Sequence, residues 1–332
     1  ISTVIESRPN IFLVNLDDAT ERMLDWRKPD GTYVMPNLQA LKAQATVFPN
    51  TVVADPSCCE SRSATFTGRY PHNNGVLRQS DGQHLDTQHT FVHYLKQSGY
   101  ATAMAGKFLT TWPTTTPPDW DRYSYIRGGY YNPVINRNGI TSTYSGYSTN
   151  LLMDHLRDSL WAFKLSNDAQ PWLAMWTPQA PHIAGGYKTL ATPETQYAAV
   201  NMGNCTQPGE LNNNRTDKPP YVSYAAADPV YVQNLCTSQI RTLISVDNQI
   251  AKMVTALRNL GEYNSTVVII QSDNGYHWNE NGWFSKFYPY EPSVSIPLYI
   301  RWPGHFNAGF DTRIASSLDV TATILDAAQV TP

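Results

Sequence analysis

Charged side chains are scarce in this chain. Asp, Glu, Lys and Arg together make up 15% of its 332 residues, and the formal net charge is −3. The sequence also lacks a long run of basic residues. Proteins that bind nucleic acid or an acidic membrane by electrostatic attraction carry a cluster of positive charge. We therefore expect neither nucleic acid nor an acidic membrane surface among the partners of this protein.

Long apolar segments are missing as well. A membrane-spanning helix requires about 20 consecutive apolar residues, whereas the longest apolar runs here, such as 265–270, have the length of a β-strand. We therefore expect no membrane span. Hydrophobic residues nevertheless make up 41% of the chain, so a chain of this length can bury enough surface to fold without disulfides.

Cysteine is rare, with four residues in the chain. Cys205 and Cys236 can pair if the compartment is oxidising, whereas a disulfide between the neighbouring Cys58 and Cys59 would be strained.

Other features bear on the compartment of the protein. The sequence begins at Ile1 rather than Met, so a leader segment can precede it. Three motifs, at Asn204, Asn214 and Asn264, are typical N-glycosylation acceptors. Together these features predict a secreted glycoprotein or one in a lysosomal or periplasmic type of compartment.

Strand-like and helix-like segments alternate along the chain. The apolar patterns predict strands at 11–16, 101–105, 172–176 and 266–271. They predict helices at 36–47, 87–98, 151–165, 239–260 and 319–328. This alternation favours an α/β fold with a mostly parallel central sheet and helices on both faces. Segments 110–148 and 183–229, rich in Pro, Gly, Asn, Thr and Tyr, predict long loops that form the walls of a pocket.

Polar pairs follow two of the predicted strands. Asp17 and Asp18 come directly after the first strand, and Asp273 and Asn274 come soon after the strand at 266–271. Since sites in such folds lie beyond the carboxyl ends of the strands, the two pairs can meet in one crevice. A turn or a helix cap is the alternative for each pair alone, but two pairs that end separate strands favour a metal site.

The segment 56–72 combines a thiol with a guanidinium group. Cys58 and Arg62 are four residues apart, so they share one face of a helix that begins near Cys58. Backbone N–H groups of the first turn would also face an anion there. The pattern indicates a nucleophile beside a fixed cation, although in isolation it also fits a buried helix with incidental cysteines.

These motifs resemble the sulfatase family, which lies within the alkaline phosphatase superfamily. The similarity extends from residue 9 to residue 326, nearly the whole chain. The family's Cys-x-Pro-x-Arg signature and its Thr-Gly-Arg-Tyr-Pro-His sequence correspond to 58–62 and 67–72. Further matches occur in family order at 17–18, 105–107, 180–182, 272–277, 286 and 289–291. The local sequences are most similar to the glucosamine-6-sulfatase branch, which acts on sulfated glycosaminoglycans.

The resemblance implies an alkaline-phosphatase-like fold and a sulfuric ester hydrolase that acts on a sulfated carbohydrate. It also implies that a formylglycine-generating enzyme oxidises Cys58 to formylglycine, whose hydrated aldehyde provides the attacking oxygen. The implied metal is Ca²⁺, with Mg²⁺ as the other option, and oxygen ligands suit such hard cations. The implied ligands are Asp17, Asp18, Cys58, Asp273 and Asn274.

The resemblance also implies roles for several basic side chains. Arg62, Lys107 and Lys286 correspond to groups that clamp the formylglycine hydroxyls and the sulfate oxygens, where fixed cations lower the cost of the developing charge. Ordinary surface lysines are the alternative reading of Lys107 and Lys286. His182 matches the histidine near the leaving group and is a candidate general acid. His277 is assigned to substrate binding.

The sequence departs from the family pattern at three places. Glu60 stands where the modification signature has Pro, and this departure bears on the maturation of Cys58. Leu109 stands where many sulfatases have a His, and the glucosamine-6-sulfatase branch also lacks that His. The sequence stops at Pro332, where the family continues into a small C-terminal subdomain. We therefore expect 1–332 to be a single catalytic domain, which is either truncated at its C-terminal end or lacks the substrate contacts that this subdomain provides.

Two other functions fit the same residues. A phosphate or phosphonate monoesterase is one, because the same cations can serve phosphoryl transfer. A non-catalytic carbohydrate-binding protein, in which Glu60 has abolished maturation, is the other.

Overall fold

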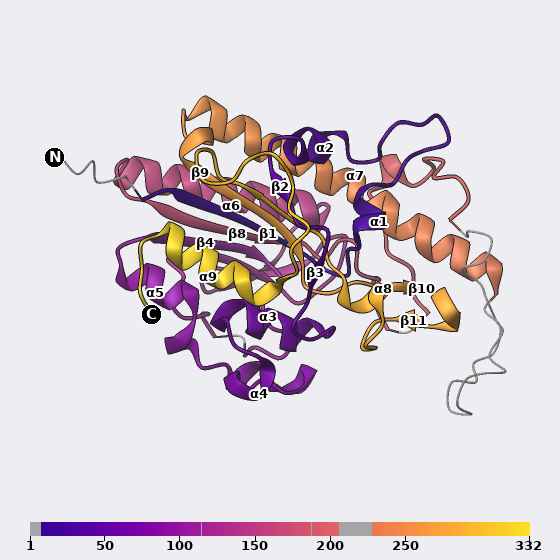
Figure 1. Ribbon diagram of the computed structural model, residues 1–332, viewed down its shortest axis with the longest axis horizontal. Helices are drawn as coiled ribbons and strands as arrows, with labels where there is room; N and C mark the ends of the chain where they lie inside the picture. The colour runs from indigo at the N-terminus through magenta and orange to yellow at the C-terminus, as the bar shows by residue number, and fades with distance from the viewer. Residues whose placement is uncertain (1–7, 114, 187, 206–227) are drawn as a thin grey trace.

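A ten-stranded sheet forms the centre of the protein (Figure 1). The computed structural model describes residues 8–113, 115–186, 188–205 and 228–332. The strand order in the sheet is β13-β2-β12-β9-β1-β8-β4-β5-β6-β7. The central strands are β9 (Thr266–Ser272), β1 (Asn10–Leu16), β8 (Trp172–Thr177), β4 (Ala101–Gly106) and β5 (Arg122–Ile126). The outer strands are β13 (Gly309–Phe310), β2 (Thr46–Val47), β12 (Leu298–Arg301), β6 (Val134–Arg137) and β7 (Ile140–Thr143).

The five central strands are all parallel, which confirms the mostly parallel centre that the sequence predicts. Both margins differ from this pattern, since β12 is antiparallel to β9 and β6 is antiparallel to β5. The loop predicted at 110–148 is therefore wrong in its middle, because it contains β5, β6 and β7. The strand β7 is exposed along its whole length, so its sequence lacks the apolar alternation that marks a half-buried strand.

Helices cover both faces of the sheet, as predicted (Figure 1). One face carries α2 (Pro36–Lys42), α6 (Ser148–Ser166) and α7 (Pro229–Asn259), and the other carries α3 (Cys58–Thr67), α5 (Phe91–Gln97) and α9 (Ser317–Ala327). Successive side chains of a strand point to opposite faces. Thus Phe12 and Val14 of β1 belong to the first hydrophobic core, and Ile11 and Leu13 belong to the second.

Three predicted helices differ clearly from the observed ones at their ends. The helix expected at 87–98 begins only at Phe91, because 87–89 form a separate 3₁₀ turn. The helix expected at 36–47 ends at Lys42, because Thr46 and Val47 pair with β12 as the short strand β2. The helix expected from 239 begins ten residues earlier, at Pro229. The Asp228 side chain accepts a hydrogen bond from the Val230 backbone N–H and so caps that helix, and Pro at the first helical position favours this start.

Short elements complete the fold. The remaining helices are α1 (Glu21–Leu24), α4 (Pro71–Asn74) and α8 (Glu291–Val294). The 3₁₀ segments in the described ranges are η1 (Gln79–His84), η2 (Thr87–His89), η3 (Thr195–Tyr197), η5 (Tyr263–Ser265) and η6 (Glu280–Gly282). Two small sheets pair β10 (His277–Trp278) with β11 (Phe284–Ser285) and β3 (Thr51–Val52) with β14 (Ala315–Ser316).

Cys205 and Cys236 form a disulfide with a Cα–Cα distance of 6.1 Å, as the sequence allows. Cys58 and Cys59 are buried free thiols, so the strained vicinal pairing is absent. In the described ranges, no helix has the length and apolar character that crossing a membrane requires. Asn214 lies outside the described residues.

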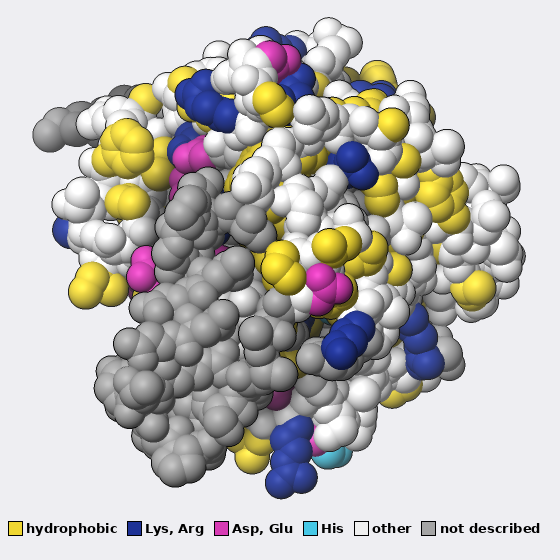
Figure 2. Space-filling model, turned by 90° about the vertical axis from the view of Figure 1, so that its right-hand side faces the viewer, with side chains coloured by type: hydrophobic (Ala, Val, Ile, Leu, Met, Phe, Trp, Pro, Cys, Tyr) yellow, Lys and Arg dark blue, Asp and Glu magenta, His cyan; other side chains and the backbone are white. Residues whose placement is uncertain are grey.

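The carboxyl ends of the parallel strands point toward the side of the molecule where α1, α8 and β10 lie, at the right of Figure 1. Figure 2 looks onto this side. Among the described residues on this face, basic and acidic side chains are scattered rather than gathered in one patch of a single sign.

Candidate active site

Helix α3 presents Cys58 at its first turn. Ser57 is the N-cap residue, with extended backbone angles, and Gly68 ends the helix in the left-handed conformation. The backbone N–H of Ser61 donates to the Ser57 carbonyl over 2.8 Å, which closes the first turn. Cys58 and Arg62 therefore lie one turn apart on a buried helix, and Arg62 is 1% exposed. The structure thus places the thiol and the guanidinium on one face, as their spacing predicts.

The ends of β1 and β9 meet beside this helix. The Asp273 backbone N–H donates to the Leu16 carbonyl over 2.9 Å, which extends the pairing of the two strands. The Asp18 backbone N–H in turn donates to Asp273 Oδ1 over 3.2 Å. Asp18 has φ 71°, a left-handed conformation that Asp tolerates better than most residues. The two polar pairs predicted from separate strands therefore lie in one place.

Three basic side chains contact these carboxylates. Lys107 Nζ donates to Asp17 Oδ2 over 2.6 Å, and Arg62 Nε donates to Asp273 Oδ2 over 2.8 Å. Lys286 Nζ pairs with Asp18 Oδ1. Lysines are rarely buried without a partner, and these contacts account for the burial of Lys286, which is 3% exposed. Lys107 and Lys286 are thus side chains of this cluster rather than ordinary surface lysines.

Position 106, directly before Lys107, has no room for a side chain. Gly106, the last residue of β4, has φ 134°, and a Cβ there would lie 2.0 Å from the Thr177 carbonyl oxygen. The Lys107 backbone N–H donates to that same oxygen over 2.8 Å. The close approach of β4 and β8 therefore fixes where Lys107 leaves the sheet.

The thiol of Cys58 lies at the centre of the cluster. Its Sγ is 2.7 Å from Lys286 Nζ, 3.5 Å from Lys107 Nζ and 3.4 Å from Asp17 Oδ1. Burial and the charge of Asp17 raise the pKa of this thiol to about 12, against the two lysines. An unmodified thiol here is therefore protonated at neutral pH, and a thiol is a weaker nucleophile than a thiolate.

The formal charges of the cluster balance, since three carboxylates face three basic groups. Burial raises the pKa of Asp17, but Lys107, His182, Arg62 and Lys286 outweigh it and hold that pKa well below its usual value. Burial and the neighbouring Asp17 raise the pKa of Asp273. Buried charges without partners are costly, so the pairing lets the cluster exist within the protein.

Several oxygen atoms of the cluster suit a hard metal ion. One ligand atom each from Asp17, Asp18, Cys58 and His182 lie within 4.8 Å of one another. Asp18 Oδ2 and Asn274 Oδ1 are buried and have no hydrogen-bond partner. Buried polar atoms normally have one, and carboxylate and amide oxygens are the ligands that hard divalent cations prefer. The residues present therefore fit such an ion.

His182 lies at the edge of the cluster. Its Nδ1 is 2.6 Å from the Ile183 carbonyl oxygen, which can only accept a hydrogen bond, so Nδ1 carries the proton. The other ring nitrogen, Nε2, is 3.7 Å from Asp18 Oδ2. A carbonyl acceptor of this kind fixes the tautomer of the imidazole and leaves Nε2 directed at the site.

A cleft of about 380 Å³ opens next to Cys58. Lys107, His182 and Lys286 contribute to its lining. The sequence motifs single out none of the ten other lining residues, which include Gln79, Thr110, Arg127, Gln179 and Phe287. Seven of the ten nevertheless lie in the segments 110–148 and 183–229, which the sequence predicts to form the walls of a pocket. Of these, Arg127 directly follows β5. Recognition of β5 as a parallel strand would have pointed to it, because residues at that end of such strands face the site.

His277 does not line this cleft. Its ring is 1% exposed, and Nδ1 lies 3.1 Å from the Ser285 carbonyl oxygen and 2.9 Å from Ser293 Oγ. Burial lowers the pKa of His277 to about 4, so the ring is neutral near pH 7. Its assignment to substrate binding therefore remains a prediction that no contact in the cleft supports.

Glu60 occupies the third position of α3 and turns back toward its start. Its Oε2 accepts a hydrogen bond from Ser57 Oγ over 2.6 Å, and Gln79 Nε2 donates to that same hydroxyl over 2.9 Å. The residue that departs from the family signature therefore contacts the N-cap of the helix that carries Cys58. Leu109 is fully buried.

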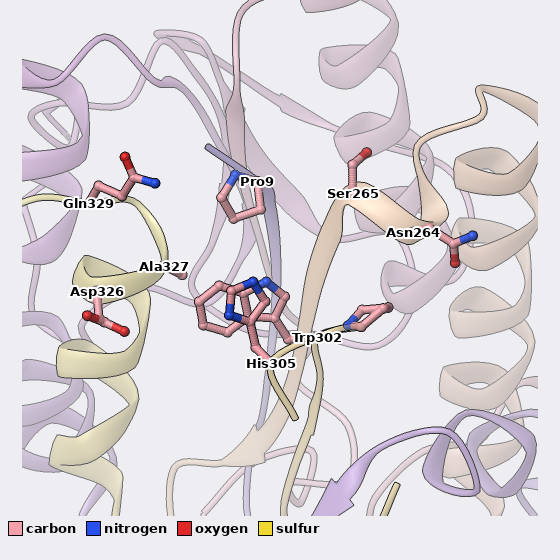
Figure 3. Close-up of a pocket in the computed structure, with 9 residues that line it drawn as sticks. Pro9, Asn264, Ser265, Trp302, His305, Asp326, Ala327 and Gln329 are labelled. Atoms are coloured by element: carbon pink, nitrogen blue, oxygen red, sulfur yellow. The ribbon is translucent and has the colours of Figure 1, made fainter. Parts of the chain in front are cut away.

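Another hollow, of about 280 Å³, lies at the opposite ends of β1 and β9 (Figure 3). Pro9, Asn264 and Trp302 line it, together with the end of α9. None of the predicted catalytic or metal-binding residues contributes to it, so the cleft beside Cys58 is the candidate active site.

Comparisons with known proteins agree with the sequence resemblance. The family model described as Sulfatase matches residues 9–330. The N-acetylglucosamine-6-sulfatase of Capra hircus is 28% identical over 351 residues, which cover 97% of this chain and 60% of that protein. The extracellular sulfatase SULF-1 homolog of Drosophila melanogaster is 27% identical over 340 residues, which cover 97% of this chain and 30% of that protein. The chain thus spans between 30% and 60% of the length of these relatives.

Solved structures share the fold. A protein in complex with its substrate D-glucosamine-2-N,6-O-disulfate matches with a TM-score of 0.79 at 22% identity, over 98% of this chain and 77% of that one. A phosphonate monoester hydrolase of Agrobacterium radiobacter matches with a TM-score of 0.66 at 17% identity, over 98% of this chain and 74% of that one. The likeness confirms the predicted alkaline-phosphatase-like fold.

Proposed function

Because this chain belongs to the sulfatase family, we propose that it hydrolyses sulfate monoesters of a carbohydrate in the cleft beside Cys58. The observation that carries this proposal is the position of the Cys58 side chain, with two lysines and Asp17 within 3.5 Å of its sulfur. A tetrahedral anion that approaches residue 58 would meet the fixed positive charges of both lysines, and fixed cations of this kind favour the hydrolysis of an anionic ester.

The substrate proposed is a 6-sulfated glucosamine unit of a glycosaminoglycan. Two observations support it: the similarity to the N-acetylglucosamine-6-sulfatase of Capra hircus, and the fold shared with a protein solved with a sulfated glucosamine. The size of the cleft, about 380 Å³, is in the range of sites for small ligands.

The nucleophile proposed is formylglycine, made from Cys58 by a formylglycine-generating enzyme. Its hydrated aldehyde would supply the attacking oxygen in place of a thiol that is protonated at neutral pH. Residue 58 lies at the start of α3, where the backbone N–H groups of the first turn favour negative charge.

The cation proposed is Ca²⁺, or Mg²⁺, held by Asp17, Asp18, Asp273, Asn274 and the oxygen of residue 58. When bound, it would polarise the sulfate and favour ionisation of the nucleophilic hydroxyl. Such an ion would also use Asp18 Oδ2 and Asn274 Oδ1, the two buried oxygens without a hydrogen-bond partner.

The basic side chains would hold the reacting group. Lys107 and Lys286, whose Nζ atoms lie 3.5 Å and 2.7 Å from the sulfur of residue 58, are placed to bind the hydroxyls formed there and the sulfate oxygens. Arg62 is held by Asp273 Oδ2 and by the Lys107 carbonyl oxygen, each at 2.8 Å. Because these bonds fix its position, Arg62 would add positive charge near the nucleophile without rearrangement.

His182 would give a proton to the leaving alcohol. Nδ1 keeps its proton in the hydrogen bond to the Ile183 carbonyl, so the proton that the protonated ring carries on Nε2 is the one that can be transferred in the cleft. General acid catalysis of this kind removes the cost of expelling an alkoxide.

Secretion is proposed from the disulfide between Cys205 and Cys236 and from the glycosylation motif at Asn264, a side chain on the surface. Disulfides persist in oxidising compartments.

Parallel assays test the proposed reaction. Purified protein with residue 58 converted should release sulfate from glucosamine 6-sulfate faster than it releases phosphate from glucosamine 6-phosphate. A dominant phosphatase or phosphonatase activity would replace the proposal with the second candidate, a phosphate or phosphonate monoesterase. Binding of the sulfated sugar without release of either anion would support the non-catalytic alternative. Lys107→Ala, prepared in the same way, should lose the sulfatase activity.

A further inference from the structure

Arg127 contributes a positive charge to the wall of the cleft, outside the cluster around Cys58. It is the first residue after β5, and β5 runs parallel to β4, the strand that leads into Lys107. Its side chain is exposed and lines the same cleft as Cys58 and His182. A ligand that fills the cleft can therefore contact the guanidinium.

The loop that carries Arg127 is tied to the loop that carries His182. The Gly129 backbone N–H donates to Gln179 Oε1 over 2.6 Å, and the Tyr130 hydroxyl donates to the His182 carbonyl oxygen over 2.5 Å. Gln179 Nε2 also donates to the Ile183 carbonyl oxygen over 3.3 Å. These bonds hold Arg127 on the side of the cleft where His182 would protonate the leaving alcohol.

Arg127 differs from the other basic residues of the cleft in having no carboxylate partner among the described residues. Arg62, Lys107 and Lys286 are each paired with a carboxylate. In the described part of the chain, by contrast, no carboxylate forms an ion pair with Arg127. Its guanidinium interacts with the hydroxyl of Tyr125, whose pKa is raised by burial, so this neighbour is a neutral phenol at physiological pH. The guanidinium remains able to pair with an anion.

We propose that Arg127 binds a second anionic group, a sulfate or a carboxylate, on the sugar that leaves during hydrolysis. This inference rests on the proposed function, and it makes Arg127 a residue that determines specificity. A guanidinium presents parallel N–H donors that match two oxygens of a sulfate or carboxylate. The protein would then prefer a doubly anionic sugar to one that carries the scissile sulfate alone.

Binding in a chain that cannot turn over tests this inference separately from catalysis. The full chain with Cys58→Ser is titrated calorimetrically with D-glucosamine-2-N,6-O-disulfate and with D-glucosamine 6-sulfate, in the presence of Ca²⁺. We expect the disulfate to bind at least about tenfold more tightly, the effect of one charged hydrogen-bonded pair. Adding Arg127→Gln should abolish that preference and leave the affinity for the monosulfate within about twofold. Arg127→Lys should keep part of the preference.

Arg69→Gln is the matched control, because Arg69 is an exposed arginine that does not line the cleft. It should keep the full preference for the disulfate. An equal preference with and without Arg127→Gln, or no binding of either sugar, overturns the inference. A preference that depends on Arg127, in a protein whose converted form releases no sulfate, contradicts the proposed function and leaves the inference standing.

Discussion

At the scale of single residues, the site is a set of buried charges that lie within hydrogen-bond distance of one another. Asp17 contacts Lys107, Asp18 contacts Lys286, and Asp273 contacts Arg62. The mutual attraction of the paired charges offsets the desolvation cost of burying these side chains. It also means that a divalent cation would bring an excess of positive charge, which a sulfate ester and an ionised nucleophile would neutralise.

Cation binding is the first prediction at this scale. Calcium added to chelator-treated protein should raise its Tm, because a ligand that binds only the folded state stabilises it. Asn274→Ala should increase the calcium concentration needed for the same rise in Tm at least about tenfold, since it removes a buried oxygen that has no other partner. The measurement is a calcium titration followed by differential scanning fluorimetry.

Asp247→Asn serves as the control, because Asp247 is a buried acid on α7 that accepts hydrogen bonds from Asn37 and Leu38, far from the cleft in sequence and in its contacts. It should lower the Tm but keep the response to calcium. An unchanged response in Asn274→Ala would remove this residue from the cation site.

The pH dependence of stability gives a second prediction. Burial and the nearby Glu60 raise the pKa of Asp55 to about 6, from 3.8. The folded state therefore binds this proton more tightly than the unfolded state, and the stability it contributes is lost as the pH rises from about 4 through 6. Asp55→Asn should raise the stability by about 1 kcal/mol at pH 7, after allowance for solvent screening of a half-buried group.

Thermal unfolding between pH 4 and pH 8 checks this. The advantage of Asp55→Asn should disappear near pH 4, where the native carboxyl is protonated. Asp326→Asn, at an exposed acid on α9, should differ little from the parent at either pH. An Asp55→Asn effect of equal size at both ends of the range would contradict the prediction.

The residues that belong to family motifs could be predicted from the sequence to lie together. Their catalytic roles remain predictions. Lys107 lies 49 residues after Cys58, and Lys286 lies 179 residues after Lys107. Only the shared order of the family motifs predicted that these three residues meet. Arg127 carries no such motif, and its position depends on β5, which the sequence did not reveal. The lack of a cleft contact for His277 follows from the packing of Ser285 and Ser293 around its ring, which spacing alone does not encode.

At the scale of elements, buried strands with apolar sequences could be read from the sequence, and short or exposed ones could not. The strand β5 was also missed, although it is largely buried, because its sequence RYSYI mixes polar and aromatic residues. The strand β9 is buried at every residue and rich in Val and Ile, which favours its recognition. The strand β2 has two residues, too few for a periodic pattern. Its pairing with β12 ends the helix predicted over 36–47, so tertiary contacts overrode a local helical preference there.

The start of α3 gives a third prediction. Glu60→Pro restores the family signature at a position in the first turn of the helix, where Pro is tolerated. It loses the hydrogen bond from Ser57, at a cost of about 1 kcal/mol. If the maturing enzyme reads this segment in an extended form, Glu60→Pro should increase the fraction of residue 58 converted to the aldehyde.

The converted fraction is measured by mass spectrometry of the peptide that contains residue 58, after expression with a formylglycine-generating enzyme. Glu60→Gln keeps the side-chain acceptor and should leave the fraction near that of the parent. A lower fraction in a folded Glu60→Pro protein would show that Glu60 helps maturation rather than hinders it.

At the scale of the whole molecule, the two ends of the parallel strands serve different purposes. The carboxyl ends carry the cleft, and the opposite ends carry the hollow at whose rim Asn264 lies (Figure 3). Expression through a secretory pathway should place an N-linked glycan on Asn264, because its side chain is exposed and Thr266 completes the motif.

Treatment with peptide N-glycosidase F should lower the mass of the peptide that contains Asn264. Asn264→Gln should abolish that change and leave sulfate release unaltered, since the hollow is separate from the cleft. An unmodified Asn264 in secreted protein would contradict this prediction.

The chemical state of residue 58 is the most direct test of the account, because the proposed reaction begins there. Protein from its native source should carry an aldehyde at that position, detected as a hydrazide-reactive residue in the peptide that spans Cys58 to Arg62. An intact thiol throughout a preparation that still releases sulfate would contradict the account.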